Sequence, residues 1–336
     1  MVNVLILLSL LISFLLTFFT MPFWIRKTKQ IGLVWTDMNK YEKPKNISGS
    51  GGIVVVLSFV LGVLFYIAVR TFSINFSDGV NLEIFALISM VLILSLVGII
   101  DDLFGWRRGG LSKRTRIFLA FFASIPLVVI NAGSSDINLP FLGMIDLGIF
   151  YPLLLIPMGV VGATTTYNFL AGFNGLEAGQ GIIILSFLSY VAYVTGSPWL
   201  SLIGLIMVAS LIGFWFYNKN PAKVFPGDSV TWAIGALIAG MAILGNFEKI
   251  AVFIFIPYIL EFFLKLRGGF GKHSFGKPNK DNSLEMPYNK IYGLEHASIY
   301  VLKRLKPSKR VYENEVVWLI HGFQIFLIIL AFFTFL

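Results

Sequence analysis

Residues 82–102 read LEIFALISMVLILSLVGIIDD, and this stretch decides the class of fold. Residues 82–100 are almost entirely apolar, and roughly 20 such residues cross a bilayer as a helix. The stretch ends in Asp101 and Asp102, two adjacent carboxylates. An apolar helix that ends in paired acidic residues predicts an integral membrane protein with polar chemistry at one membrane boundary.

Similar apolar stretches recur along the whole chain. The 336 residues are 57% hydrophobic and 13% charged, whereas soluble domains have about 25% charged residues. We therefore predict one all-α integral membrane domain, residues 1–336, with about ten transmembrane helices. The predicted spans are 2–20, 51–69, 82–100, 115–131, 149–167, 180–196, 198–216, 229–245, 250–265 and 316–335.

The basic residues predict the orientation. Of the 26 Lys and Arg residues, Arg70 and Lys249 lie at outer span ends, and the other 24 lie in or beside five alternate loops. Positively charged loops stay in the cytoplasm, so both termini are expected on the outer side of the cell membrane. The predicted cytoplasmic loops are about 21–49, 101–114, 168–179, 217–228 and 266–315.

Two function classes are disfavoured by composition. The net charge of +9 resides in short loops that face anionic lipid headgroups, so membrane lipids and not nucleic acid are the expected partners. The absence of cysteine excludes disulfides and thiolate metal sites.

In the outer loop 132–148, alternation around a Pro/Gly turn predicts a small hairpin.

The adjacent carboxylates of Asp101 and Asp102 repel each other, and a divalent cation is the usual compensation. An ordinary solvated helix end is the alternative interpretation. A basic run that ends in Lys113, Arg114 and Arg116 follows. This run suits phosphate binding, although orientation alone would also explain it.

The loop 168–180, NFLAGFNGLEAGQ, contains no Lys or Arg, so orientation does not explain it. Asn side chains provide an oxygen ligand and two donors, and Gly lets the backbone approach a ligand closely. The alternative is a polar capped loop between two helices.

Two further loops carry candidate residues. Residues 218–229 contain Phe225, which could stack on a base, and Asp228, which is either a ligand or a plain helix cap. The loop 266–315 holds Lys272, His273 and Lys277 among glycines, and it could fold over a bound nucleotide. Carboxylates and amides without His or Cys clusters favour Mg²⁺, and the P-loop and dinucleotide-binding glycine patterns are absent.

Together these loops resemble the polyprenyl-phosphate N-acetylhexosamine-1-phosphate transferases of glycosyltransferase family 4. The match is closest to the archaeal and eukaryotic UDP-GlcNAc–dolichyl-phosphate GlcNAc-1-phosphotransferases. Residues 168–180, Val224–Asp228 and Asp101–Asp102 carry the resemblance. It implies ten spans, a cytoplasmic active site, and dependence on Mg²⁺, for which Mn²⁺ may substitute.

The resemblance also implies residue roles. Asn168 and Asp228 would be metal ligands, while Asp101 and Asp102 would order the water shell of the metal and the phosphates. Asn174 and Phe225 would hold the uracil, and Lys113 would bind phosphate. The remaining nucleotide-sugar residues would be Gly175, Glu177, Lys272, His273 and Lys277.

Two positions depart from the family pattern. The animal enzymes carry Arg-His-Arg where this chain has Lys272–His273–Ser274, and an ammonium does not replace a bidentate guanidinium. Around residues 48–52 there is also no acidic residue where those enzymes have one.

The expected function is transfer of a sugar 1-phosphate, GlcNAc 1-phosphate above all, from a UDP-sugar to a polyprenyl (dolichyl-type) phosphate. The products would be polyprenyl-diphospho-sugar and UMP. The alternatives are another UDP-HexNAc donor or an inactive paralogue that binds lipid or nucleotide. A secondary transporter would need ionisable residues near the bilayer midplane, and the predicted spans are almost free of them. The sequence leaves open whether the chain forms a homodimer.

Overall fold

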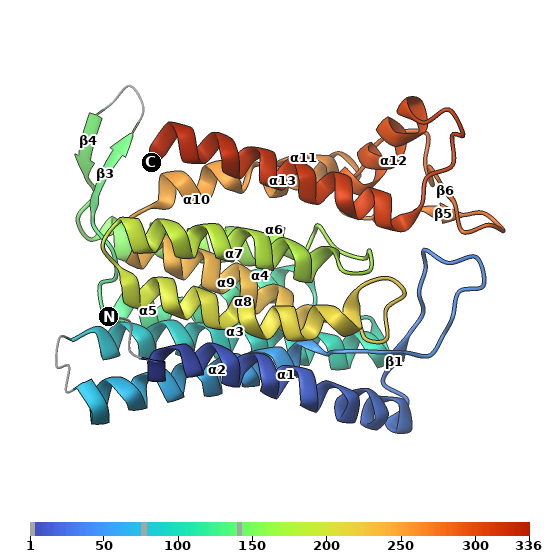
Figure 1. Cartoon of the computed structure of the whole chain (residues 1–336). Coiled ribbons are helices and arrows are strands. Elements are labelled where there is room, and N and C mark those ends of the chain that lie inside the picture. Colours follow the sequence, from blue (N-terminus) through green and yellow to red (C-terminus); the bar gives the residue numbers. More distant parts are fainter. Residues whose placement is uncertain (1–3, 75–78, 140–142) are drawn as a thin grey trace.

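The protein is a bundle of long helices whose polar loops gather at one end (Figure 1). The computed structural model describes residues 4–74, 79–139 and 143–336. Its helices are α1 (Val4–Ile31), α2 (Gly52–Val69), η1 (Arg70–Ile74), α3 (Val80–Arg108), α4 (Lys113–Ala123), α5 (Ile125–Val129), η2 (Tyr151–Leu155), α6 (Ile156–Tyr167), α7 (Leu176–Val194), α8 (Pro198–Asn218), α9 (Asp228–Leu244), α10 (Glu248–Ile254), α11 (Ile256–Arg267), α12 (Leu294–Leu305) and α13 (Glu313–Phe335).

Three antiparallel strand pairs complete the described fold. They are β1 (Val34–Trp35) with β2 (Ile47–Ser48), β3 (Asp136–Leu139) with β4 (Gly143–Asp146), and β5 (Lys277–Pro278) with β6 (Leu284–Glu285). The hairpin expected in loop 132–148 is confirmed by the second pair, in which Asp136 faces Asp146, and its place on the outer side stays a prediction. Its turn, residues 140–142, lies outside the described residues, as do residues 2 and 3 of the first predicted span.

The all-α membrane fold is confirmed. Six helices in the described ranges are long and apolar enough to cross a membrane: Leu5–Ile31, Gly52–Phe72, Val80–Trp106, Leu176–Val194, Pro198–Asn218 and Glu313–Phe335. The other predicted spans fall on α9, which is apolar but shorter, and on three helices interrupted near a proline. Proline lacks a backbone N–H and suits the first turn of a new helix, so each of these three spans consists of two helical pieces. The count of ten spans stays a prediction.

Two predicted boundaries were wrong. The first helix continues to Ile31 instead of ending at residue 20, and α3 continues to Arg108. Asp101 and Asp102 therefore lie within a helix and not in a loop. A helix satisfies its own backbone hydrogen bonds in lipid and in water alike, so the end of an apolar run need not end the helix.

The two ends of the bundle differ. In Figure 1 the β3–β4 hairpin lies at the same end as the beginning of α1 and the end of α13. The β1, β5 and β6 strands lie at the opposite end, together with α12. The segments that carry the candidate residues therefore meet at one end, as the charge pattern predicted, and the side of the membrane that this end faces stays a prediction.

The helix α9 is the buried centre of the bundle, and α3 packs against its first residues. Residues 229–243 of α9 are all buried. A Cβ added at Gly98 of α3 would lie 2.5 Å from the carbonyl carbon and oxygen of Asp228. Only a residue without a side chain allows this approach, and the approach brings the carboxylates of α3 beside the first turn of α9.

Replacing Gly98 with Ala should therefore disturb the core although Ala favours a helix. Overpacking of this kind costs about 1–3 kcal/mol, so thermal unfolding in detergent, followed by tryptophan fluorescence, should occur at a lower temperature. Gly159→Ala is the matched control, because a Cβ added at this helical glycine meets no described atom within 4 Å. Equal melting temperatures for the two variants would contradict the packing argument.

Candidate functional site

Backbone hydrogen bonds join the first and fourth polar loops. The N–H of Phe225 donates to the carbonyl of Ser48 at 2.8 Å, and the N–H of Gly51 donates to the carbonyl of Phe225 at 3.0 Å. The N–H of Gly52 donates to Pro226 at 2.8 Å. Buried backbone groups need such partners, and this pairing fixes the place of Phe225.

Buried polar side chains join the remaining loops. The side chain of Asn39 donates to the carbonyl of Gly172 at 2.8 Å and accepts from the N–H of Gly276 at 3.0 Å. The N–H of Asn174 donates to Glu313 Oε1 at 2.8 Å. Residues far apart in the sequence thus form one composite surface at the end of the bundle.

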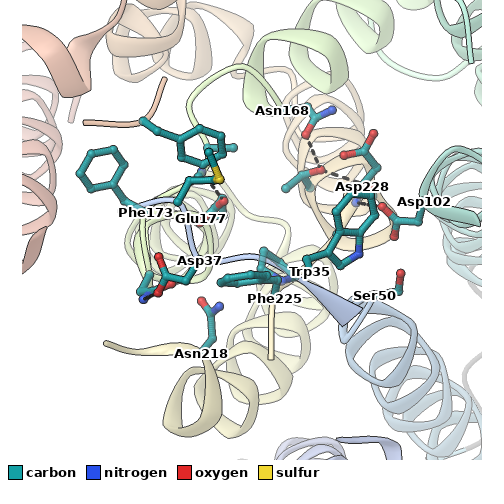
Figure 2. A pocket seen from close by; sticks show the side chains of 18 of the residues that line it. Trp35, Asp37, Ser50, Asp102, Asn168, Phe173, Glu177, Asn218, Phe225 and Asp228 are labelled. Atoms are coloured by element: carbon teal, nitrogen blue, oxygen red, sulfur yellow. Dashed lines mark hydrogen bonds between the residues drawn. The ribbon is translucent and has the colours of Figure 1, made fainter. Parts of the chain in front are cut away.

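This surface encloses a first cavity of about 380 Å³. Figure 2 shows Asn168, Asp228 and Asp102 on one side and Asp37 on the other, with Trp35 and Phe225 between them in this view. Six of the predicted site residues line the cavity: Asp102, Asn168, Asn174, Glu177, Phe225 and Asp228.

The acidic side of the cavity is built around the start of α9. The N–H of Asp228 donates to Asp102 Oδ1 at 2.8 Å, and the Thr231 hydroxyl donates to Asn168 Oδ1 at 3.0 Å. Gly227, the residue before the helix, has φ of 72°, a conformation that favours glycine. The turn lets the carboxylate of Asp228 enter the cavity, where its side chain is 25% exposed.

Asp101 turns away from the cavity and pairs with Arg116. The carboxylate of Asp101 is 1% exposed, and its Oδ2 lies 2.7 Å from Arg116 Nε. A second contact of 3.0 Å joins Oδ1 and Nη2, and the N–H of Leu111 donates to Oδ1 at 2.6 Å. Arg116 Nη1 also lies 3.7 Å from Asp228 Oδ2. The guanidinium thus compensates one carboxylate and approaches another.

The donor atoms at this end suit a hard divalent cation. Within the described ranges, Asp102 Oδ2 is buried and makes no hydrogen bond of good geometry, with the hydroxyl of Ser50 nearby. The carboxylate of Asp228 and the amide oxygen of Asn168 face the same cavity. No cluster of three or more His, Cys, Asp or Glu side chains suited to a metal occurs in the described part of the chain. A cation here would have two carboxylates and one amide oxygen as protein ligands. In phosphate-transfer sites Mg²⁺ typically takes one or two carboxylates and leaves its other positions to water and substrate phosphates.

The other side of the first cavity contains a residue that sequence reasoning missed. Asp37 is 5% exposed, and its Oδ2 accepts from the Asn174 side chain at 2.9 Å. Glu177 Oε1 accepts from the N–H of Gly172 at 2.8 Å, and Lys40 forms an ion pair with Glu313. The predicted residues Asn174 and Glu177 are thus held in place by these contacts beside the aromatic rings.

A second cavity of about 520 Å³ lies next to the first and shares Asn168, Ala171 and Phe275 with it. Its wall combines cations with large apolar side chains. The cationic or titratable members are Lys113, Arg116, Lys265, Lys272 and His273. The apolar members include Ile117, Phe169, Trp232, Phe262 and Phe270. An anionic headgroup attached to an apolar chain fits such a wall.

Three predicted residues lie elsewhere. Asp101 is behind the acidic side, as described above. Gly175 lines a separate cavity of about 140 Å³ and has φ of 82° before α7. Lys277 is exposed in β5 and is not among the described residues that line the first two cavities.

Other cavity residues were not predicted. They are Trp35, Asp37, Asn218 and Thr231 in the first cavity, and Trp232 and Lys265 in the second. Trp35 and Asp37 could have been found from the sequence, because neither residue is needed to orient the protein in the membrane. Asn218, Thr231 and Lys265 lie in or beside helices, and their spacing gives no sign that they face a cavity.

The fold and the site define a multi-pass membrane protein with one composite polar site at a single end of its bundle. The sequence profile described as glycosyl transferase family 4 matches residues 84–246. The chain belongs to this family.

Three relatives illustrate the membership. A Saccharolobus solfataricus protein, provisionally named UDP-N-acetylglucosamine–dolichyl-phosphate N-acetylglucosaminephosphotransferase, is 39% identical over 83% of each chain. The Dictyostelium discoideum UDP-N-acetylglucosamine–dolichyl-phosphate N-acetylglucosaminephosphotransferase is 34% identical over 76% of this chain and 70% of its own. A Streptococcus pyogenes phospho-N-acetylmuramoyl-pentapeptide-transferase is 32% identical over 76% of this chain and 77% of its own.

Replacing Arg116 with Met should destabilise the protein, because the buried carboxylate of Asp101 loses its counter-charge. We expect a loss of about 1–3 kcal/mol, between the values for exposed and fully buried pairs. The double variant Arg116→Met/Asp101→Asn should recover part of this loss. Thermal unfolding of the two variants measures the difference, and a double variant no more stable than the single one would refute the pairing.

Proposed function

We propose that the protein transfers GlcNAc 1-phosphate from UDP-GlcNAc to a dolichyl-type polyprenyl phosphate at the cytoplasmic face of the cell membrane. The products are polyprenyl-diphospho-GlcNAc and UMP. The observation that carries the proposal is the pair of cavities that share a wall at Asn168, one polar and aromatic, the other cationic and apolar. The names of the Saccharolobus and Dictyostelium relatives support the choice of donor and acceptor.

The first cavity suits the UDP-sugar. The rings of Trp35 and Phe225 offer surfaces on which a uracil can stack. Asp37 and Asn174 place an acceptor and an amide beside these rings, and both kinds of group recognise the edge of a base. The nucleoside would occupy this side, so that the diphosphate extends towards Asp228.

The acidic side suits Mg²⁺, for which Mn²⁺ is the proposed substitute. Asp102, Asn168 and Asp228 would hold the ion. The structural reason for this choice is Asp102 Oδ2, which is buried and makes no hydrogen bond of good geometry with the described residues. When bound, the ion would supply positive charge to the diphosphate. Asp101 would act indirectly, since its pairing with Arg116 positions that guanidinium beside Asp228.

The second cavity suits the polyprenyl phosphate. Its cations would bind the phosphate, while Ile117, Trp232 and Phe262 would contact the first apolar units of the chain. A phosphate oxygen of the acceptor attacks the β-phosphorus of the donor. A new phosphorus–oxygen bond forms, and the bond from the β-phosphorus to the bridging oxygen breaks, so that UMP leaves with that oxygen. A phosphate monoester has a second pKa of about 6, so the nucleophile is largely ionised at neutral pH and needs no dedicated base.

The purified wild-type protein should form a radiolabelled lipid from labelled UDP-GlcNAc, dolichyl phosphate and Mg²⁺. Asp228→Ala should lower this rate by about a hundredfold or more, because the variant removes a carboxylate at the proposed ion site. Glu42→Ala is the control, since Glu42 is exposed on a neighbouring loop. Wild-type rates in the Asp228 variant would remove Asp228 from the site.

A panel of UDP-sugars in the same assay separates the alternatives. Product with UDP-GlcNAc alone supports the proposal, whereas product with another UDP-HexNAc changes the donor. Binding of UDP-sugar without any product would indicate the inactive paralogue instead.

Removing divalent cations with EDTA should abolish turnover, and added Mg²⁺ or Mn²⁺ should restore it, whereas Ca²⁺ should restore less because it favours larger and more flexible coordination shells. The initial rate is measured against free ion concentration. Full activity in EDTA would contradict the metal assignment, and it would leave the proposed substrates unaffected.

A further inference from the structure

The ammonium of Lys265 lies in the wall of the second cavity, and the sequence pattern assigned it no role. Lys265 belongs to the last turn of α11 and is 7% exposed. Its Nζ donates to the hydroxyl of Ser274, which lines the same cavity. Glu261 Oε1 lies 3.4 Å from this Nζ. A buried ammonium is costly unless it is paired, so specific partners set its position.

The negative partners lie behind the ammonium. Glu261 and Glu295 are both 0% exposed, and neither belongs to the described wall of the cavity. The N–H of Leu294 donates to Glu261 Oε2 at 2.6 Å and so joins α12 to α11. A Cβ added at Gly293 would lie 2.6 Å from Glu295 Oε2 and 3.0 Å from Glu261 Oε1, so the two side chains converge there. The positive end of the cluster thus faces the cavity.

The titratable groups of α12 that interact with this cluster are His296 and Glu295. Burial, together with the nearby charge of Lys265, lowers the pKa of His296 to about 4, so its ring is neutral at pH 7. Burial and the charge of Glu261 raise the pKa of Glu295 well above its ordinary value, which favours the neutral acid. The ion pair of Lys265 with Glu261 thus has a neutral imidazole, and not a second cation, near it.

Lys265 also differs from the lysines near the cavity mouth. Lys113 is exposed and donates to the carbonyl of Phe270 at 3.3 Å, and Lys272 lies over the ring of Tyr288. Lys265 is held by a hydroxyl and a carboxylate, and its rotamer freedom is already lost before any ligand arrives. A preorganised group binds with a smaller entropic cost.

We propose that Lys265 binds a substrate phosphate in the second cavity and that Glu261 and Ser274 are positioning residues that hold its ammonium. This inference rests on the proposed function for the identity of the phosphate. The phosphate belongs either to the donor diphosphate or to the polyprenyl acceptor, and the two share the same recognition chemistry.

The test uses the double variant Lys265→Met/Glu261→Gln, which removes the ammonium and its buried counter-charge together. No unpaired buried charge remains, and Glu261→Gln alone is the reference that keeps the ammonium. A hydrogen bond to a charged group corresponds to a loss of about tenfold to a hundredfold, so one KM should rise by that factor relative to the reference. The KM for UDP-GlcNAc and the KM for dolichyl phosphate are measured separately, with calorimetric UDP-GlcNAc binding as a third readout.

Lys290→Met is the matched control, because Lys290 is exposed in the loop between β6 and α12. Lys265→Arg should keep most of the affinity. A rise in the donor KM and in the UDP-GlcNAc dissociation constant assigns the contact to the diphosphate, and a rise in the acceptor KM alone assigns it to the lipid. A folded double variant with all three constants unchanged overturns the proposal.

If the double variant does not fold, Ser274→Ala tests the same idea, because it frees the ammonium without removing its charge. The KM for one of the two substrates should then rise, by a smaller factor than that expected for the double variant. Unchanged KM values for both substrates overturn the proposal. Absence of lipid product from the wild-type protein would contradict the proposed function. Unchanged constants in an active enzyme would contradict the role of Lys265 alone.

Discussion

The hydrogen bond from the backbone N–H of Asp228 to Asp102 Oδ1 is the contact on which the rest of the site depends. It joins α3, two turns before that helix ends, to the start of α9, and it exists only because Gly98 lets the two helices approach closely. The bond uses one oxygen of Asp102, and the other is buried and makes no hydrogen bond of good geometry with the described residues. Structural packing and candidate ion binding are therefore united in one carboxylate.

Charge compensation explains how so many ionisable groups are placed at the end of an apolar bundle. Arg116 neutralises Asp101, Lys40 pairs with Glu313, and Lys265 pairs with Glu261. In each pair a partner comes from a different segment or a different helical turn, so pairing also determines how segments meet. Removing one member leaves a buried charge, which costs more than the pair itself contributes.

Under the proposed function, the two cavities would let a water-soluble donor and a lipid acceptor meet. The polar cavity opens among loops, and the cationic cavity has an apolar wall supplied by α4, α9 and α11. Asn168 belongs to both, and it follows directly after the last turn of α6. A phosphate held in one cavity would thus be next to a phosphate held in the other. Bringing the reacting groups together in this way supplies much of the rate enhancement in phosphoryl transfer.

The sequence by itself determined the all-α membrane class, the hairpin of loop 132–148 and the family, because apolar length, charge and local motifs are written along the chain. It also identified Asp102, Asn168, Asn174, Glu177, Phe225 and Asp228, which lie together in one cavity. Only the tertiary structure decided that Asp101 pairs with Arg116 while its neighbour Asp102 faces the cavity. The same is true of Asp37 and Lys265, whose partners Asn174 and Ser274 come from other segments. The physical reason is that adjacent helical positions point about 100° apart, and their surroundings are set by packing between distant segments.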